Sequence, residues 1–172
     1  RFSDALFHLR QLMKHEEMSQ RRDLRIALGD CYQITRRHNE AREVFLELSR
    51  EDDTDVDAWI KLGQAAWIVG DDTSLREAAR RVTSLAPQRH EGYILVGRIE
   101  QRAGRTAKAI AAFEKASRFA PDSALPHILK GLTFEQSGDT AAAAQAYQAA
   151  LQAEPTDPRA RRLLAGVSTE LN

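Results

Sequence analysis

Residues 124–157 read ALPHILKGLTFEQSGDTAAAAQAYQAALQAEPTD, and their outline recurs along the chain at a constant interval, which is the length of this stretch. Residues 90–123, HEGYILVGRIEQRAGRTAKAIAAFEKASRFAPDS, place an aromatic residue, two glycines, small apolar residues and a proline in the same phase. Self-similarity at a fixed period of this length is typical of arrays in which one supersecondary unit is stacked many times. The sequence therefore predicts a repeat protein.

Four series of residues carry the repeat, and all four have the same step. The series are Pro87, Pro121 and Pro155; Trp59, Tyr93 and His127; Gly29, Gly63, Gly97 and Gly131; and Gly70, Gly104 and Gly138. Chance does not readily produce four independent series in one phase, so the units are expected to share one local structure.

The spacing of apolar residues predicts that each unit is helical. Ala109, Phe113 and Ala116 recur at steps of three and four residues, which marks one face of a helix. A glycine inside a helix costs about 1 kcal/mol relative to alanine. We therefore expect Gly97 to permit a close helix–helix approach, with the small Ala109 as its neighbour. The second glycine series should end the first helix of each unit in the left-handed conformation.

This pattern resembles that of the tetratricopeptide repeat family, and the resemblance covers nearly the whole chain. In the last full unit the matching residues are His127, Lys130, Gly131, Phe134, Gly138, Ala143, Tyr147, Ala150 and Pro155. The resemblance implies an all-α fold, a right-handed superhelix (an α-solenoid) of antiparallel helix hairpins.

The resemblance also implies a division of the chain. We expect one domain over residues 1–172, with a partial N-terminal repeat helix at 1–21, four repeats at 22–55, 56–89, 90–123 and 124–157, and a C-terminal capping helix at 158–172. Within the first segment, residues 2–18 are expected to form a single helix. Thr54 or Asp55, Asp122 or Ser123, and Thr156 or Asp157 are expected to cap the helices that follow them.

The composition limits the possible functions. Lysine plus arginine and aspartate plus glutamate both total 25, and this balance disfavours a strongly basic nucleic-acid binder. A single cysteine excludes an intrachain disulfide and a cysteine-based zinc site. No apolar run approaches the length of a membrane span, and no signal peptide is recognisable. We expect a cytoplasmic protein, and, because the first residue is not Met, a processed form or fragment of a longer one.

The motifs of known catalytic sites are missing. No histidine pair flanks a glutamate at zinc-hydrolase spacing, and neither a phosphate-binding loop nor a nucleophile elbow occurs. The acidic run at residues 51–57 lacks the glycine and terminal glutamate of a calcium loop. His127 occupies an aromatic position of the repeat, which favours a packing role. We therefore expect no enzymatic activity, no metal and no cofactor.

The family resemblance places a partner-binding groove on the first helices of the repeats. One groove position carries isoleucine in every repeat, and we expect these side chains to be partly exposed, with Ile60, Trp67 and Ile94 at the centre of the face. The full set of candidates is Ile26, Ile34, Ile60, Gln64, Trp67, Ile68, Ile94, Arg98, Arg102, Ile128 and Leu132. The alternative is that the isoleucines pack against neighbouring helices.

Two features refine the class of partner. Arginines are dense between residues 76 and 105, and they form either solvated helix faces or a patch for an acidic partner. The family's clamp for chaperone C-termini requires Lys and Asn, but the matching residues are Ile26 and Asp30, or Ile60 and Gln64. Recognition of chaperone C-termini is therefore disfavoured.

The sequence thus predicts a non-enzymatic protein–protein interaction module or scaffold that binds a peptide or helix in its concave groove. Two alternatives stay open. The chain could be a regulatory or substrate-recruiting segment of a larger transferase or hydroxylase, or it could assemble with itself as a homo-oligomeric scaffold.

Overall fold

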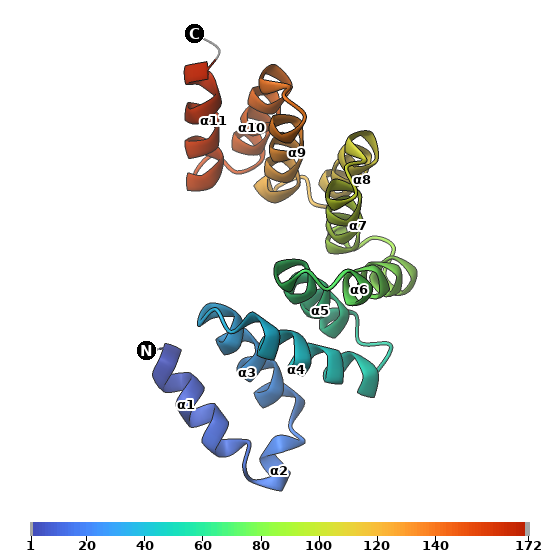
Figure 1. Cartoon of the computed structure of the whole chain (residues 1–172), viewed down its shortest axis with the longest axis vertical. Helices are drawn as coiled ribbons and strands as arrows, with labels where there is room; N and C mark the ends of the chain where they lie inside the picture. The colour runs from blue at the N-terminus through green and yellow to red at the C-terminus, as the bar shows by residue number, and fades with distance from the viewer. Residues whose placement is uncertain (1, 171–172) are drawn as a thin grey trace. The chain divides into compact units, whose positions relative to one another are not determined.

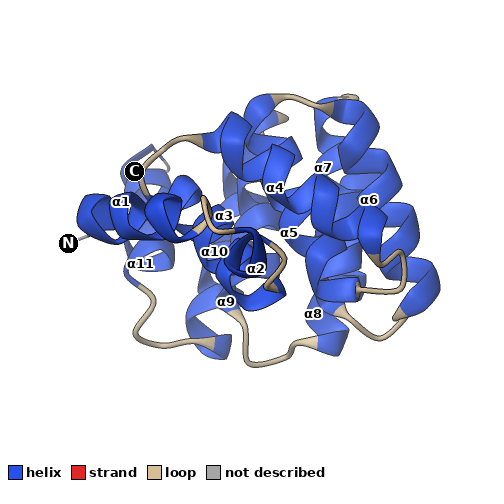
Figure 2. Cartoon of the chain, turned by 90° about the horizontal axis from the view of Figure 1, so that it is seen from below, coloured by secondary structure: helices blue, strands red, loops and turns tan. Residues whose placement is uncertain are grey.

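The computed structural model describes residues 2–170, apart from the side chains of Ser19 and Glu170. Within these residues the secondary structure consists of eleven helices and no strand (Figure 2). The predicted all-α fold is confirmed.

The helices follow one another as hairpins. The first helices are α3 (Arg22–Ile34), α5 (Val56–Val69), α7 (His90–Arg102), α9 (Ala124–Gln136) and α11 (Pro158–Glu170), and their first residues are equally spaced along the chain. The second helices are α4 (His38–Glu51), α6 (Asp72–Leu85), α8 (Thr106–Phe119) and α10 (Thr140–Ala153). Two short helices, α1 (Phe2–Leu12) and α2 (Glu16–Ser19), precede them.

The chain divides into two compact units, Arg1–Ala86 and Pro87–Asn172. In the first unit α3 packs against α4, α4 against α5 and α5 against α6, while α1 lies against α3 (Figure 1). In the second unit α7, α8, α9, α10 and α11 pack in the same sequential way. From α3 to α6 in the first unit, and from α7 to α11 in the second, each helix therefore packs against the next one in the chain, as expected for a repeat array.

The N-terminal segment differs from its prediction, because residues 2–18 do not form one helix. The backbone hydrogen bonds change at Lys14, whose N–H bonds to Gln11 O at 3.2 Å, three residues back. His15 then takes an extended conformation. The side chains from Lys14 to Glu17 are exposed, so no packing face rewards a continuous helix there.

Three glycines of the first helices, Gly29, Gly97 and Gly131, lie under aromatic rings. A Cβ atom added to Gly97 would lie 2.3 Å from the ring of Phe113, and one added to Gly131 would lie 2.3 Å from the ring of Tyr147. The prediction that Ala109 is the close neighbour of Gly97 is wrong. Ala109 is buried in the same cluster, but the Phe113 ring fills the space that the missing side chain leaves.

The second glycine series behaves as predicted. Gly70, Gly104 and Gly138 have φ values of 79°, 69° and 82°, in the left-handed region where glycine is the least strained residue. In the first hairpin the equivalent residue is Arg36, with φ at 63°. The turn at Arg36 therefore has the same left-handed backbone conformation as the other turns, although it lacks the glycine that adopts this conformation with the least strain.

Three of the predicted helix caps are confirmed. The Asp55 carboxylate accepts from Ala58 N at 3.1 Å, the Ser123 hydroxyl from Leu125 N at 3.4 Å, and the Asp157 carboxylate from Ala160 N at 2.6 Å. Each cap satisfies an N–H group that has no partner inside its helix. These caps fix where α5, α9 and α11 begin.

Candidate functional site

The predicted isoleucine row of the groove is mostly core. Ile60 and Ile94 are only 6% exposed and Ile128 is 1% exposed, so the expectation that they are partly exposed is wrong. Ile94 belongs to the cluster around Phe113, and Ile128 belongs to the cluster that joins α9, α10 and α11. Of this row only Ile26 is half-buried. These side chains hold the helices together and leave little surface for a partner.

A different pair of isoleucines is exposed on the first unit. Ile34 on α3 is 53% exposed and Ile68 on α5 is 52% exposed, and the two occupy the same position in successive repeats. The Asp30 carboxylate, one turn before Ile34, and Lys61 Nζ, two turns before Ile68, form an ion pair at 2.6 Å that joins α3 to α5. The exposed Gln64 lies one turn before Ile68, on the same side of α5. We call the surface formed by the two isoleucines and these three polar neighbours the apolar face.

Trp67, another predicted groove residue, directly precedes Ile68 on α5. Its side chain is half-buried. Aromatic side chains with one face accessible often dominate the energy of protein interfaces. Trp67 therefore remains a candidate contact residue.

The second unit has a basic face in place of an apolar one. Arg102 is exposed and Arg98 is half-buried, one turn apart on α7. Burial, followed by the like charges of Arg159 and Arg102, lowers the pKa of the Arg98 guanidinium to about 10. The structure thus brings an arginine of α11 close enough to α7 to repel Arg98, and an anion bound there would relieve this repulsion.

Polar contacts complete this region. Gln101 Nε2 donates to Gln136 Oε1 at 2.9 Å, which joins α7 to α9. Leu132, another predicted groove residue, is only partly exposed and packs against two core clusters. The second unit therefore presents amides and arginines where the first presents isoleucines.

The arginine-rich stretch does not form one patch. Arg76 and Arg80 are exposed on α6, whereas Arg81 pairs with Asp53 at 3.1 Å. Arg105 donates to the Glu100 carboxylate within the second unit. Arg81 and Arg105 are therefore each held by a carboxylate of the same unit.

A contact that the sequence analysis did not predict recurs in the first three hairpins. In each of them a side chain of the second helix covers the fourth residue of the first helix. In the second hairpin the Arg81 guanidinium lies 5.5 Å from the centre of the Trp59 ring. In the third hairpin Lys115 Nζ lies 4.4 Å from the centre of the Tyr93 ring. Both are cation–π contacts, and both cations come from the second helix of the same hairpin.

In the first hairpin the cation lies on the first helix and the second helix supplies carboxylates. Arg25 takes the place of the aromatic residue, and it pairs with Glu47 at 3.2 Å and with Glu51. Glu47, Arg81 and Lys115 have the same spacing as the glycine and proline series. Aligning the repeats over their second helices would have revealed these positions, which the family pattern leaves unspecified.

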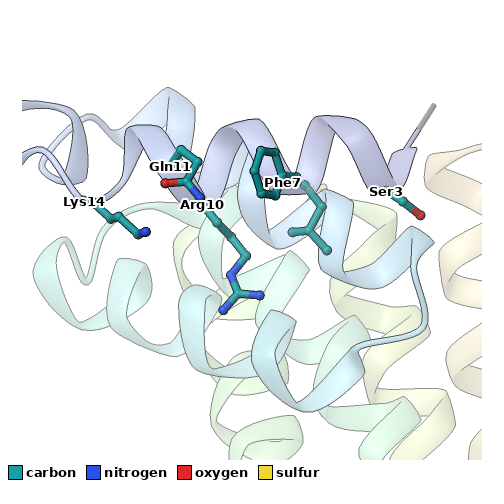
Figure 3. A pocket seen from close by; sticks show the side chains of 6 residues that line it. Ser3, Phe7, Arg10, Gln11 and Lys14 are labelled. Atoms are coloured by element: carbon teal, nitrogen blue, oxygen red, sulfur yellow. The ribbon is translucent and has the colours of Figure 1, made fainter.

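A cavity of about 420 Å³ lies along α1 in the first unit (Figure 3). Its lining residues are Ser3, Leu6, Phe7, Arg10, Gln11 and Lys14. Phe7 is 60% exposed. The sequence prediction did not include this cavity, because it assigned residues 1–21 only as a partial N-terminal repeat helix.

No group of three or more His, Cys, Asp or Glu side chains in residues 2–170 is arranged to hold a metal ion. Over the same range no helix combines the length and the apolar character that crossing a bilayer requires.

The fold and its recurring glycine, aromatic and proline positions define a helical-hairpin repeat protein. Residues 72–124 and 127–167 match profiles described as tetratricopeptide repeat, and together they span more than half of the chain. The chain belongs to the tetratricopeptide repeat family. Proteins built from this repeat typically serve as protein-interaction modules.

Solved structures share the fold at low sequence identity. The crystal structure of MamA matches with a TM-score of 0.70 and 23% identity over 90% of this chain and 89% of that one. A thermophilic tetratricopeptide protein of Thermus thermophilus matches with a TM-score of 0.74 and 21% identity, over 86% of this chain and 81% of that one. A chain from the APC/C hetero-tetramer Cut9–Hcn1 matches with a TM-score of 0.80 and 18% identity. The match covers 98% of this chain and 34% of that one. No curated protein sequence matches the chain.

Proposed function

We propose that this chain is a non-enzymatic binding module that holds a peptide or helix of a partner protein against its first helices. The observation that carries the proposal is the pair of exposed isoleucines on the apolar face, Ile34 and Ile68. Fully burying an isoleucine stabilises a complex by about 1.5–3 kcal/mol. A partner that covers both isoleucines removes from water the apolar surface that they expose in the free chain, and this burial favours binding.

The repetition of this pair supports a role in binding. Single exposed apolar residues are common on protein surfaces and need no explanation. Here the same repeat position is exposed and apolar on two helices that the Asp30–Lys61 ion pair holds together. A partner with apolar residues at matching intervals would contact both side chains at once, with Gln64 as a polar contact between them.

The second unit contributes a different selectivity. Arg98 and Arg102 favour carboxylates in the partner, because the region already carries the additional charge of Arg159. A segment that binds the second unit is therefore expected to carry acidic residues. This refinement concerns the basic face alone and is separable from the apolar contact.

Photo-crosslinking tests the proposal directly. A benzophenone amino acid placed at Ile34 or Ile68 should crosslink to one recurrent partner in extracts of the native host. The matched control is the same amino acid at Leu85, which is 40% exposed but lies on a second helix. Equal crosslinking from all three positions would overturn the assignment of the apolar face.

Substitutions provide a second test. Ile34→Asp with Ile68→Asp should leave the helical circular dichroism and the melting temperature within a few degrees of the wild type, because both side chains are half in water. The partner identified by crosslinking should then be lost, while Leu85→Asp should retain it. Retention of the partner by the double variant would contradict the proposal.

A further inference from the structure

The fourth hairpin lacks the side chain that covers the equivalent site in the other three. Glu47, Arg81 and Lys115 reach from the second helix over the residue four positions into the first helix. The next residue in this series is Ala149, opposite His127. Alanine has no side chain beyond Cβ, so it cannot make the contact.

A cavity of about 150 Å³ occupies this place. Helix α9 lines it with His127, Lys130 and Phe134. Helix α10 lines it with three alanines and one uncharged polar residue, which are Ala142, Ala146, Ala149 and Gln145. The site is therefore open in the fourth hairpin, because Ala149 stands where a longer side chain covers the equivalent site in the other three. The cavity is large enough for the end of one side chain from another molecule.

The charges of the cavity favour an anionic guest over a cationic one. Lys130 lines it beside His127, and its ammonium group would repel a second cation. The Lys130 ammonium group also pairs with the Glu114 carboxylate on α8 at 2.6 Å, so a guest carboxylate would share this cation with Glu114. The residues that α10 contributes to the lining carry no charge.

The first hairpin shows how an anion is held at this position. Arg25, the equivalent of His127, is paired with the carboxylates of Glu47 and Glu51. A basic residue at this site of the repeat therefore takes a carboxylate when the second helix provides one. In the fourth hairpin Ala149 and Ala153 replace the two glutamates, so a carboxylate would have to come from outside.

We propose that the cavity between α9 and α10 is a receptor for a glutamate or aspartate side chain of a partner protein, with His127 and Lys130 as the groups that bind the carboxylate. Phe134 and the alanines of α10 contact the aliphatic part of the guest. This site uses different residues from the apolar and basic faces, so it can fail without affecting the proposed function.

The proposal implies a direction for the pH dependence. Burial, and after it the charge of Lys130, lowers the pKa of His127 below its ordinary value of 6.5, so the free imidazole is neutral at pH 7. A bound carboxylate favours the protonated imidazole and raises this pKa. Binding should therefore tighten as the pH falls from 7 towards 5.5, where aspartate and glutamate are still ionised. Glu114 already contacts Lys130, and α10 adds no charged group to the lining.

An intramolecular test places the carboxylate at the position seen in the first hairpin. In Ala149→Glu, NMR titration should show the pKa of His127 raised by about one pH unit relative to the wild type. Ala149→Gln is the length-matched neutral control and should not raise it, and Ala149→Lys should lower it. The His127 signal is assigned by its loss in His127→Gln. A pKa that rises equally in the Glu and Gln variants would overturn the role of charge.

An intermolecular test uses poly-L-glutamate, with poly-L-lysine as the opposite charge. Poly-L-glutamate should shift the His127 resonances of the wild type, and its affinity should fall at least about tenfold in Ala149→Gln, which fills the cavity. Ala141→Gln, at an exposed position of α10, should bind like the wild type. Undiminished binding by Ala149→Gln, a preference for poly-L-lysine, or no shift of His127 at any ratio would each overturn the proposal.

Discussion

The third and fourth hairpins have the same interior but different surfaces. In both, a glycine of the first helix lies under an aromatic ring of the second, Gly97 under Phe113 and Gly131 under Tyr147. Their outer contacts differ, because Lys115 covers Tyr93 whereas Ala149 leaves a cavity beside His127. The comparison shows that the positions which pack the hairpin can be constant while the covering position varies, and that the covering position determines what a partner can reach.

The largest effect is expected at the shared isoleucine position. Ile94→Asp or Ile128→Asp should unfold its hairpin, because each removes about 1.5–3 kcal/mol of apolar burial and leaves a carboxylate buried without a partner. Circular dichroism during thermal unfolding measures the effect. Ala141→Asp, on the exposed side of α10, is the control and should change little. A folded Ile94→Asp variant with wild-type melting would restore this row as groove surface.

The next largest effect is expected at the glycines. Gly97→Leu and Gly131→Leu should each cost about 3 kcal/mol, because the added side chain overlaps the ring of Phe113 or Tyr147 and the core must open to accept it. Urea unfolding gives the free energy. Gly166→Leu is a matched control, since nothing lies within 4 Å of the added Cβ and the helix gains a better helix-forming residue. Equal stability of all three variants would show that these rings are not closely packed.

The positions of the helices were accessible from the sequence because one period determines them. The glycines that follow α5, α7 and α9 and the capping residues Asp55 and Asp157 act over a few residues, so a linear pattern contains their whole physical cause. The break after Leu12 was missed because it depends on which side chains find packing partners, and no glycine or proline marks it.

The candidate sites were less predictable, since burial depends on residues distant in the sequence. The isoleucines at positions 60, 94 and 128 share a helical period with the core on one side and with the predicted groove on the other, and periodicity alone does not separate these faces. The cavity beside His127 depends on Ala149, which lies on the following helix, α10. Its signal was present in the repeat alignment, at a position that the family pattern does not constrain.

A smaller effect is expected at the turns. Gly104→Arg and Gly138→Arg copy the residue found in the first hairpin, and each should cost about 1 kcal/mol, because a residue with a Cβ is strained at positive φ. The reverse change, Arg36→Gly, should stabilise the first hairpin by about the same amount. Urea unfolding of the three variants measures both directions. A stabilising Gly→Arg change would mean that contacts of the arginine side chain outweigh the strain, and the turns would then not be equivalent.

The smallest effect concerns the covering contact itself. Lys115→Ala should cost about 0.5–1 kcal/mol, the usual contribution of an exposed cation–π pair. A double-mutant cycle with Tyr93→Leu isolates this coupling from the loss of the lysine stem. In the fourth hairpin, Ala149→Lys with His127→Leu should show no favourable coupling, because Lys130 repels a second ammonium group beside the imidazole. A favourable coupling in both hairpins would mean that His127 accepts a cation as Tyr93 does. It would remove the charge difference between the two surfaces and leave only the difference in volume.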